Sequence, residues 1–159
     1  MFQSVYSQVA LGFLVLSCGF AIWKGDTAER ASACLIAAMW LLTLLASSIT
    51  RSYLPAISFL ASDGLLALGL LILAVRFSSW WLGAAMLLQA VALALHAGYF
   101  AAEKADLSYQ ILWDYVAGKN IASVLMLIII MAATVASIRK RAKKREAAAE
   151  RLPAAAAPI

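Results

Sequence analysis

Five long apolar stretches, separated by short polar links, set the tightest limit on how this chain can fold. They cover residues 5–23, 31–49, 57–75, 81–101 and 116–138. A helix needs about 20 residues to cross the roughly 30 Å hydrocarbon core of a bilayer, and each stretch comes close to that length. The sequence therefore predicts an all-α, multi-spanning transmembrane helix bundle with five spans.

The composition agrees with a bilayer as the solvent. Hydrophobic residues make up 65% of the 159 residues and charged residues 13%, whereas soluble domains are roughly half apolar and about a quarter charged. The links carry residues that end and start helices, such as Gly25 and Asp26 before the second stretch and Pro55 before the third. So few charged side chains would not cover the surface of a soluble domain.

A four-span arrangement is the alternative to five spans. It would leave out the stretch at 31–49, which ends in Ser47 and Ser48. The first links of the chain would then move to the opposite side of the membrane.

A basic segment follows the last apolar stretch and predicts a second region of the chain. Seven of the 13 Lys and Arg residues lie between positions 139 and 151. No Gly or Pro interrupts residues 120–152, so the fifth helix is expected to continue into this segment. We therefore divide the chain into a helical bundle at 1–138 and a basic, Ala-rich tail at 139–159, with a disordered end after position 152.

The distribution of basic residues predicts the orientation in the membrane. With five spans, ten basic residues share the side of the tail, including Lys24, Arg30 and Arg76, and three lie on the other side: Arg51, Lys104 and Lys119. The count places the tail in the cytoplasm and the N-terminus outside. Trp113 and Tyr115, before the last span, are then expected at the level of the outer headgroups.

The tail itself is expected to contact anionic lipid headgroups or a partner protein. The residues proposed for this contact are Arg139, Lys140, Arg141, Lys143, Lys144 and Arg145. The net charge of +5 also raises nucleic-acid binding as a possibility. The tail, however, has no aromatic side chain to stack on a base, so we expect no nucleic-acid partner.

Four polar side chains within the apolar stretches form the candidate functional patch. Asp63 belongs to the third stretch, and Gln89, His96 and Tyr99 belong to the fourth. The two stretches are joined by a short link, so they are expected to pair as antiparallel helices. At 1.5 Å per residue, Asp63 and His96 lie within about 3 Å of the same depth. An Asp63–His96 hydrogen bond or ion pair is therefore expected.

This patch has two interpretations. Polar groups in hydrocarbon are costly and often serve transport, and an imidazole beside a carboxylate exchanges protons near neutral pH. The patch can therefore be a proton relay or a small-ligand site. It can equally be a structural contact between helices, since such polar pairs average only about 0.6 kcal/mol in membrane bundles.

The sequence does not indicate an enzyme, a metal site or a cofactor. The chain has one histidine, and its two cysteines, Cys18 and Cys34, lie inside apolar stretches without metal-site spacing. No catalytic or nucleotide-binding motif is present. Small residues at Ala90, Ala94 and Gly98 form a stripe along the fourth stretch, which would let another helix approach closely.

Part of the chain resembles a group of small bacterial inner-membrane proteins. The resemblance rests on Gly25–Arg30 before the second stretch, on Asp63, and on Trp80 and Trp81 followed by Gln89 and His96. It covers about half of the chain and implies a bacterial inner membrane, without implying an activity.

These observations lead to two functional hypotheses. The first is a non-enzymatic membrane protein that acts by association, as an accessory or assembly subunit of a membrane complex or as a homo-oligomer. The alternative is a small transporter or proton-coupled channel that uses Asp63, Gln89 and His96.

Overall fold

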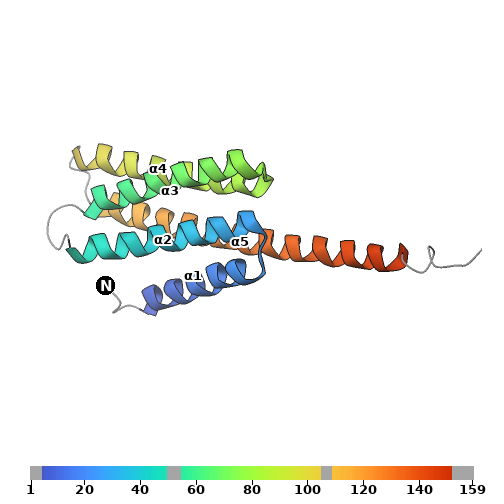
Figure 1. Cartoon of the computed structure of the whole chain (residues 1–159). Coiled ribbons are helices and arrows are strands. Elements are labelled where there is room, and N and C mark those ends of the chain that lie inside the picture. Colours follow the sequence, from blue (N-terminus) through green and yellow to red (C-terminus); the bar gives the residue numbers. More distant parts are fainter. Residues whose placement is uncertain (1–4, 50–54, 105–108, 152–159) are drawn as a thin grey trace, which may run out of the picture.

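The chain folds into a bundle of α-helices (Figure 1). The structure is a computed structural model and describes residues 5–49, 55–104 and 109–151. Five helices make up this part of the chain, which confirms the all-α prediction: α1 Val5–Lys24, α2 Thr27–Ile49, α3 Pro55–Phe77, α4 Trp80–Lys104 and α5 Tyr109–Arg151. Arg51 and residues 152–159, on which parts of the orientation and tail predictions rest, lie outside the described residues.

Four of the five helices are long and apolar enough to cross a membrane, namely α2, α3, α4 and α5. The remaining helix, α1, is apolar but falls short of this length over its described side chains, Gln8–Lys24. The four-span alternative removed the stretch at 31–49, yet this stretch lies in α2, which has the required length.

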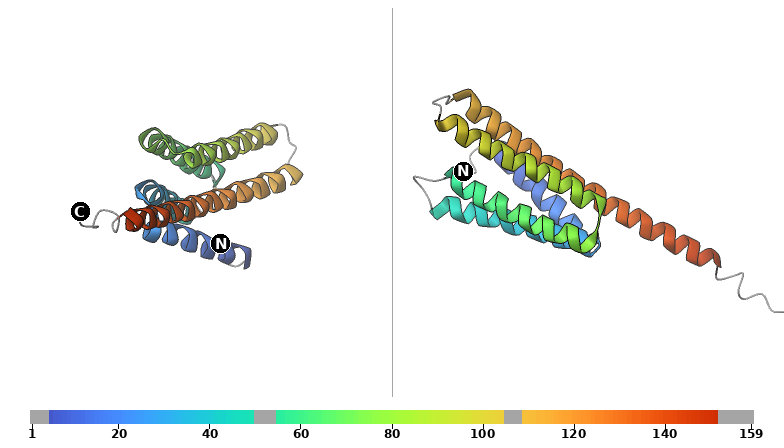
Figure 2. Two further views of the ribbon diagram at one scale, coloured as in Figure 1. Left: turned by 90° about the vertical axis from the view of Figure 1, so that its right-hand side faces the viewer. Right: turned by 90° about the horizontal axis from the view of Figure 1, so that it is seen from above.

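The helices form a closed ring in chain order. Each helix contacts the next, and α5 closes the ring by packing against α1. Since successive helices run in opposite directions, α1 and α5 run in the same direction (Figure 2). Across the ring, the backbones of α2 and α5 approach each other, whereas those of α3 and α5 do not over the residues that the structure describes. The bundle is therefore more closely packed on one side of the ring than on the other.

The two ends of the bundle differ in their packing. We call the end with the α1–α2 and α3–α4 turns, from which α5 extends, the tail end, and the opposite end the head end (Figure 1). Fully buried apolar side chains such as Leu70, Leu82 and Ile130 belong to one hydrophobic cluster that includes residues of all five helices. Most of this cluster lies in the half near the tail end, whereas the polar residues of the candidate site lie in the half near the head end.

The outward faces of the helices are strongly apolar. Large hydrophobic side chains such as Leu16, Val75 and Leu87 are exposed, as expected for helices that contact lipid. Trp23 lies in the last turn of α1 and Trp80 begins α4, and both are exposed at the tail end. Exposed tryptophans are typical of the boundary between hydrocarbon and headgroups, so this boundary fits the tail end of the bundle.

The last helix continues far beyond the bundle (Figure 1). α5 has 43 residues, which is about 65 Å at 1.5 Å per residue. It runs without a break from Tyr109 through the basic residues to Arg151. The expected continuation of the fifth helix into the basic segment is thus present in the structure.

A tight turn joins α1 to α2 at Gly25 and Asp26. The Gly25 N–H donates to the Ala21 carbonyl (2.8 Å), and Asp26 occupies the N-cap position of α2. Glu29 accepts a hydrogen bond from the Asp26 N–H (2.9 Å), which is half of a capping box. This close return of the chain brings Gly25 against Glu29, and a Cβ atom at position 25 would lie 2.8 Å from the Glu29 Cβ and closer still to the Ala21 carbonyl oxygen.

Replacing Gly25 by alanine is expected to lower the free energy of unfolding by about 1–3 kcal/mol, the usual cost of overpacking. The backbone carbonyl of Ala21 cannot move aside as a flexible side chain can. Thermal unfolding of the purified protein in detergent measures this effect. Gly19→Ala is the matched control, because a Cβ there meets no atom within 4 Å; equal melting temperatures of the two variants would contradict the prediction.

Candidate functional site

The Asp63 carboxylate is the centre of a polar cluster between α3, α4 and α5. Its Oδ2 atom lies 2.7 Å from the His96 Nε2. The expected Asp63–His96 contact is therefore present. His96 is fully buried and Asp63 has a side-chain exposure of 16%, so the pair is largely shielded inside the bundle.

Gln89 attaches α4 to the backbone of α3 beside this pair. Its Nε2 donates to the Asp63 carbonyl oxygen (3.0 Å), and its side chain is buried. Gln89 and His96 are two helical turns apart and share one face of α4. α4 therefore holds Asp63 at two points, once through the backbone and once through the carboxylate.

Lys119 joins the cluster from α5. Its Nζ lies 3.0 Å from the same Asp63 Oδ2 atom and 4.5 Å from the centre of the Phe59 ring. Lys119 was expected among the basic residues on the outer side of the membrane, and the structure adds that its ammonium group faces Asp63 inside the bundle. Its position three residues into the predicted fifth span was the signal that could have identified it.

Tyr115 completes the cluster behind His96. Its hydroxyl lies 2.9 Å from the His96 Nδ1, and the side chain is buried. Tyr115 was expected at the headgroup level, and the structure shows that its ring packs against His96 and Tyr99 of α4; the side chain of Trp113 lies outside the described residues. Tyr99 packs its ring against Tyr115, with 4.8 Å between centroids, and so lies one contact away from His96.

The hydrogen bonds form a continuous chain. If His96 is neutral and its Nε2–H donates to Asp63, its Nδ1 accepts a hydrogen bond from the Tyr115 hydroxyl. Both ring nitrogens of His96 then have a partner, and Lys119 donates to the same carboxylate. Such a network favours one tautomer of the imidazole. It also provides a path for a proton between a phenol, an imidazole and a carboxylate.

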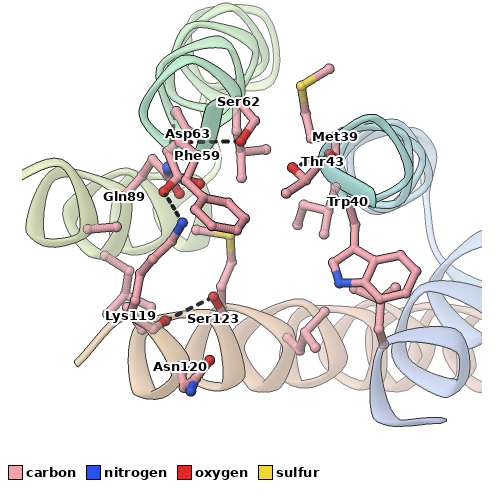
Figure 3. A pocket seen from close by; sticks show the side chains of 18 of the residues that line it. Met39, Trp40, Thr43, Phe59, Ser62, Asp63, Gln89, Lys119, Asn120 and Ser123 are labelled. Carbon is pink, nitrogen blue, oxygen red and sulfur yellow. Dashed lines mark hydrogen bonds and ion pairs between the residues drawn. The ribbon is translucent and has the colours of Figure 1, made fainter. Parts of the chain in front are cut away.

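The cluster faces a partly open cavity of about 560 Å³ in the half of the bundle near the head end. All five helices contribute to its lining. Figure 3 shows Asp63 and Lys119 on one wall and Met39, Trp40 and Thr43 of α2 on the wall opposite. The cavity lies where the backbones of α3 and α5 stay apart and the Lys119 side chain reaches Asp63, so the spacing of the helices creates it.

A second polar cluster lies at the tail end. Glu29 is buried, with an exposure of 4%, and its carboxylate accepts hydrogen bonds from the Ser137 hydroxyl (2.8 Å) and the Asp26 N–H. Arg141 forms an ion pair with Asp26 (3.3 Å) and donates to the Lys24 carbonyl. Glu29 lies in the first turn of α2, and nothing in the local sequence distinguishes it from an exposed carboxylate at that position.

Buried hydroxyl groups occupy the region between the two clusters. Ser17, Ser32 and Thr134 have no exposed surface. The Ser17 hydroxyl contacts the Met131 sulfur (3.1 Å) and Thr134 bonds its own helix. Within the described residues, the Ser32 Oγ is a buried polar atom without a hydrogen-bond partner. An unsatisfied buried hydroxyl is costly, and a water molecule can satisfy it where space permits.

The small-residue stripe does not pack against the rest of this chain. Ala90, Ala94 and Gly98 are all exposed, and a Cβ at Gly98 would meet no atom within 4 Å. The predicted close approach of another helix therefore remains a prediction for a separate partner. Close packing within the bundle occurs instead at Gly69, where a Cβ would lie 2.6 Å from Leu35.

The basic residues of the tail are exposed along the extension of α5. Of the six residues proposed for headgroup or partner contact, Arg141 also binds the bundle, through Asp26 and Lys24. The other five project from the extension: Arg139, Lys140, Lys143, Lys144 and Arg145. Over the described part of the chain, no three His, Cys, Asp or Glu side chains are grouped to hold a metal ion.

Comparison of the chain with protein-family models, with curated proteins and with solved structures finds no match. The resemblance of Gly25–Arg30, Asp63 and His96 to small bacterial inner-membrane proteins therefore stays a prediction. Any functional interpretation has to come from the chemistry of the site itself.

Proposed function

We propose that this chain is a multi-pass membrane protein that provides a pathway for protons, with the Asp63–His96 pair as the proton-binding site. The observation that carries the proposal is the Asp63 carboxylate, which binds His96 and Lys119 through one oxygen atom on the wall of a cavity inside the bundle. Ionisable groups inside a bundle are costly, and they commonly mark ion pathways.

The rest of the bundle supplies elements that such a pathway needs. The cavity gives access to Asp63 in the half near the head end. In the half near the tail end, Ser32 lies one helical turn from Glu29 in α2 and Thr134 one turn from Ser137 in α5, and both hydroxyls are buried. Apolar side chains, Leu14 and Ile36 among them, separate the two regions. We infer that this apolar layer is the closed gate of the pathway in the conformation described.

Reconstituted vesicles test this function directly. The purified protein is placed in liposomes that contain a pH-sensitive dye, and a potassium diffusion potential, negative inside, is applied with valinomycin. Protein-containing vesicles are expected to acidify faster than protein-free vesicles. Equal rates in both, measured over a range of external pH, would refute the proposal.

We further propose five spans in a bacterial inner membrane, with the tail in the cytoplasm. The proposal is supported by the apolar composition of α1 and by the exposed basic residues on the extension of α5. A cysteine introduced at Ala142 should react with an impermeant maleimide only after the membrane is opened. Labelling in intact cells would place the tail outside and reverse the assignment.

Association with another membrane protein is the second candidate function, as a non-enzymatic accessory or assembly subunit. The exposed stripe of Ala90, Ala94 and Gly98 favours it, because small residues allow close packing of helices. A partner in stoichiometric amounts is expected after purification in a mild detergent, and is expected to be lost in Ala94→Leu. Recovery of the wild type without a partner or a second copy would refute this candidate.

A further inference from the structure

We propose that the cavity binds an organic monoanion with an apolar body, and that it does so when the Asp63–His96 pair takes up a proton. The inference rests on the proposed function in one respect, which is that this pair is protonated reversibly. It adds the chemical class of the ligand and the residue that would recognise it, Lys119.

The charges around the cavity support the choice of an anion. Among the described lining residues, Lys119 is the one cation and Asp63 the one carboxylate. The structure gives the Lys119 ammonium one acceptor, the Asp63 Oδ2 atom, and the face of the Phe59 ring. An ammonium group has three N–H donors, so Lys119 can bind a second acceptor that enters from the cavity.

Proton binding and anion binding are coupled because His96 and Lys119 share one oxygen atom of Asp63. The Asp63 Oδ2 atom accepts from both His96 and Lys119. One proton on this pair, whether the carboxyl or the imidazole carries it, neutralises the charge that holds Lys119. The Lys119 ammonium would then be unpaired in a largely apolar site, which is unfavourable. An anion that enters the cavity and becomes the partner of Lys119 in place of the Asp63 carboxylate is therefore stabilised. By linkage, a bound anion must favour protonation to the same extent.

The groups that face Asp63 from each neighbouring helix are consistent with this coupling. α4 contributes His96 and Gln89, and α5 contributes Lys119 and, through His96, Tyr115. On the opposite wall, α2 presents Met39, Trp40 and Thr43, none of which carries a charge. No further described ionisable group lines the cavity, so one proton releases one cation, and the expected ratio is one proton to one monoanion.

The walls of the cavity define the body of the ligand. Apart from the cluster, the lining is mostly apolar and includes Ile36, Met39, Trp40 and Leu88. A volume of about 560 Å³ lies in the range of sites for small organic ligands. The ligand is therefore expected to place an aromatic or aliphatic body against α2 and its acidic group against Lys119.

Equilibrium binding tests the proposal without requiring transport. Naphthalene-2-sulfonate is the probe because it remains anionic over the whole pH range, and calorimetry is done with protein in phosphatidylcholine nanodiscs. Affinity is expected to rise about ten-fold as the pair becomes protonated. Buffers of different ionisation enthalpy should report uptake of one proton per probe. A naphthyl trimethylammonium ion with the same ring system should not bind.

Two variants change the binding in opposite directions. Asp63→Asn cannot hold Lys119 by charge, so it is expected to bind the sulfonate at neutral pH about ten-fold more tightly than wild type and without pH dependence. Lys119→Gln is expected to abolish binding, whereas Lys119→Arg retains part of it. Lys24→Gln removes an exposed lysine at the tail end and is the matched control.

The outcomes separate this inference from the proposed function. Failure of wild-type protein to bind the sulfonate, or weaker binding by Asp63→Asn, would overturn the anion site even if proton uptake is observed. Binding that takes up a proton would support it even if vesicles show no proton uptake. An anionic lipid headgroup has the same chemistry, and weaker sulfonate binding in phosphatidylglycerol nanodiscs would identify lipid as the source of the anion.

Discussion

Vesicles that contain the Asp63→Asn variant are expected to take up protons at least about ten-fold more slowly than wild-type vesicles, because an amide cannot exchange the proton that a carboxylate binds and releases. The substitution preserves the size of the side chain. Its carbonyl oxygen can still accept the hydrogen bond from His96 Nε2, and the backbone contact with Gln89 does not depend on the side chain.

The control for this variant is Asp114→Asn, which changes an exposed carboxylate near the start of α5. This variant is expected to behave as wild type in the same dye assay. Size-exclusion profiles and circular dichroism of both variants establish that each is folded. A folded Asp63→Asn protein with the wild-type rate would show that the Asp63 cluster is a structural contact between helices.

Glu29→Ala is expected to lower the free energy of unfolding by about 2–4 kcal/mol, because it leaves two donors in the tail-end cluster without their acceptor. These donors are the Ser137 hydroxyl, which connects α2 to α5, and the Asp26 N–H, which begins α2. The loss should appear as a lower midpoint of unfolding when the protein in mild detergent is titrated with sodium dodecyl sulfate.

Two further variants show whether burial accounts for this effect. Arg141→Ala removes an exposed ion pair with Asp26 and is expected to cost at most about 1 kcal/mol. Glu146→Ala changes an exposed carboxylate on the extension of α5 and should fall within about 0.5 kcal/mol of wild type. A loss in Glu29→Ala no larger than that in Glu146→Ala would mean that the Glu29–Ser137 contact does not hold the tail end together.

Predictions that depended on local sequence agree best with the structure. The first four apolar stretches became helices within about four residues of the expected boundaries, because helix length and hydropathy are properties of a continuous segment; α5 begins earlier than the fifth stretch, at Tyr109. The Asp63–His96 contact was also predictable. A short link forces α3 and α4 to pair, and the rise per residue then fixes the depth of each side chain.

Lys119, Tyr115 and Glu29 could not be assigned in the same way. Lys119 and Tyr115 belong to α5, which reaches α4 only after a longer connection, so their facing partners depend on how the ring closes. Glu29 reads from sequence as an ordinary residue in the first turn of a helix. It is buried because Ser137, 108 positions away in the chain, packs against that turn.

The sequence by itself determined the helices of this protein, their order and the length of its last helix, because each of these depends on runs of neighbouring residues. The tertiary structure alone decided that the helices close into a ring, that α3 and α5 leave a cavity between them, and that one oxygen atom of Asp63 binds both His96 and Lys119. The physical reason is that contacts between distant segments depend on the rotation of each helix about its axis, and hydropathy that is nearly uniform around these helices does not specify that rotation.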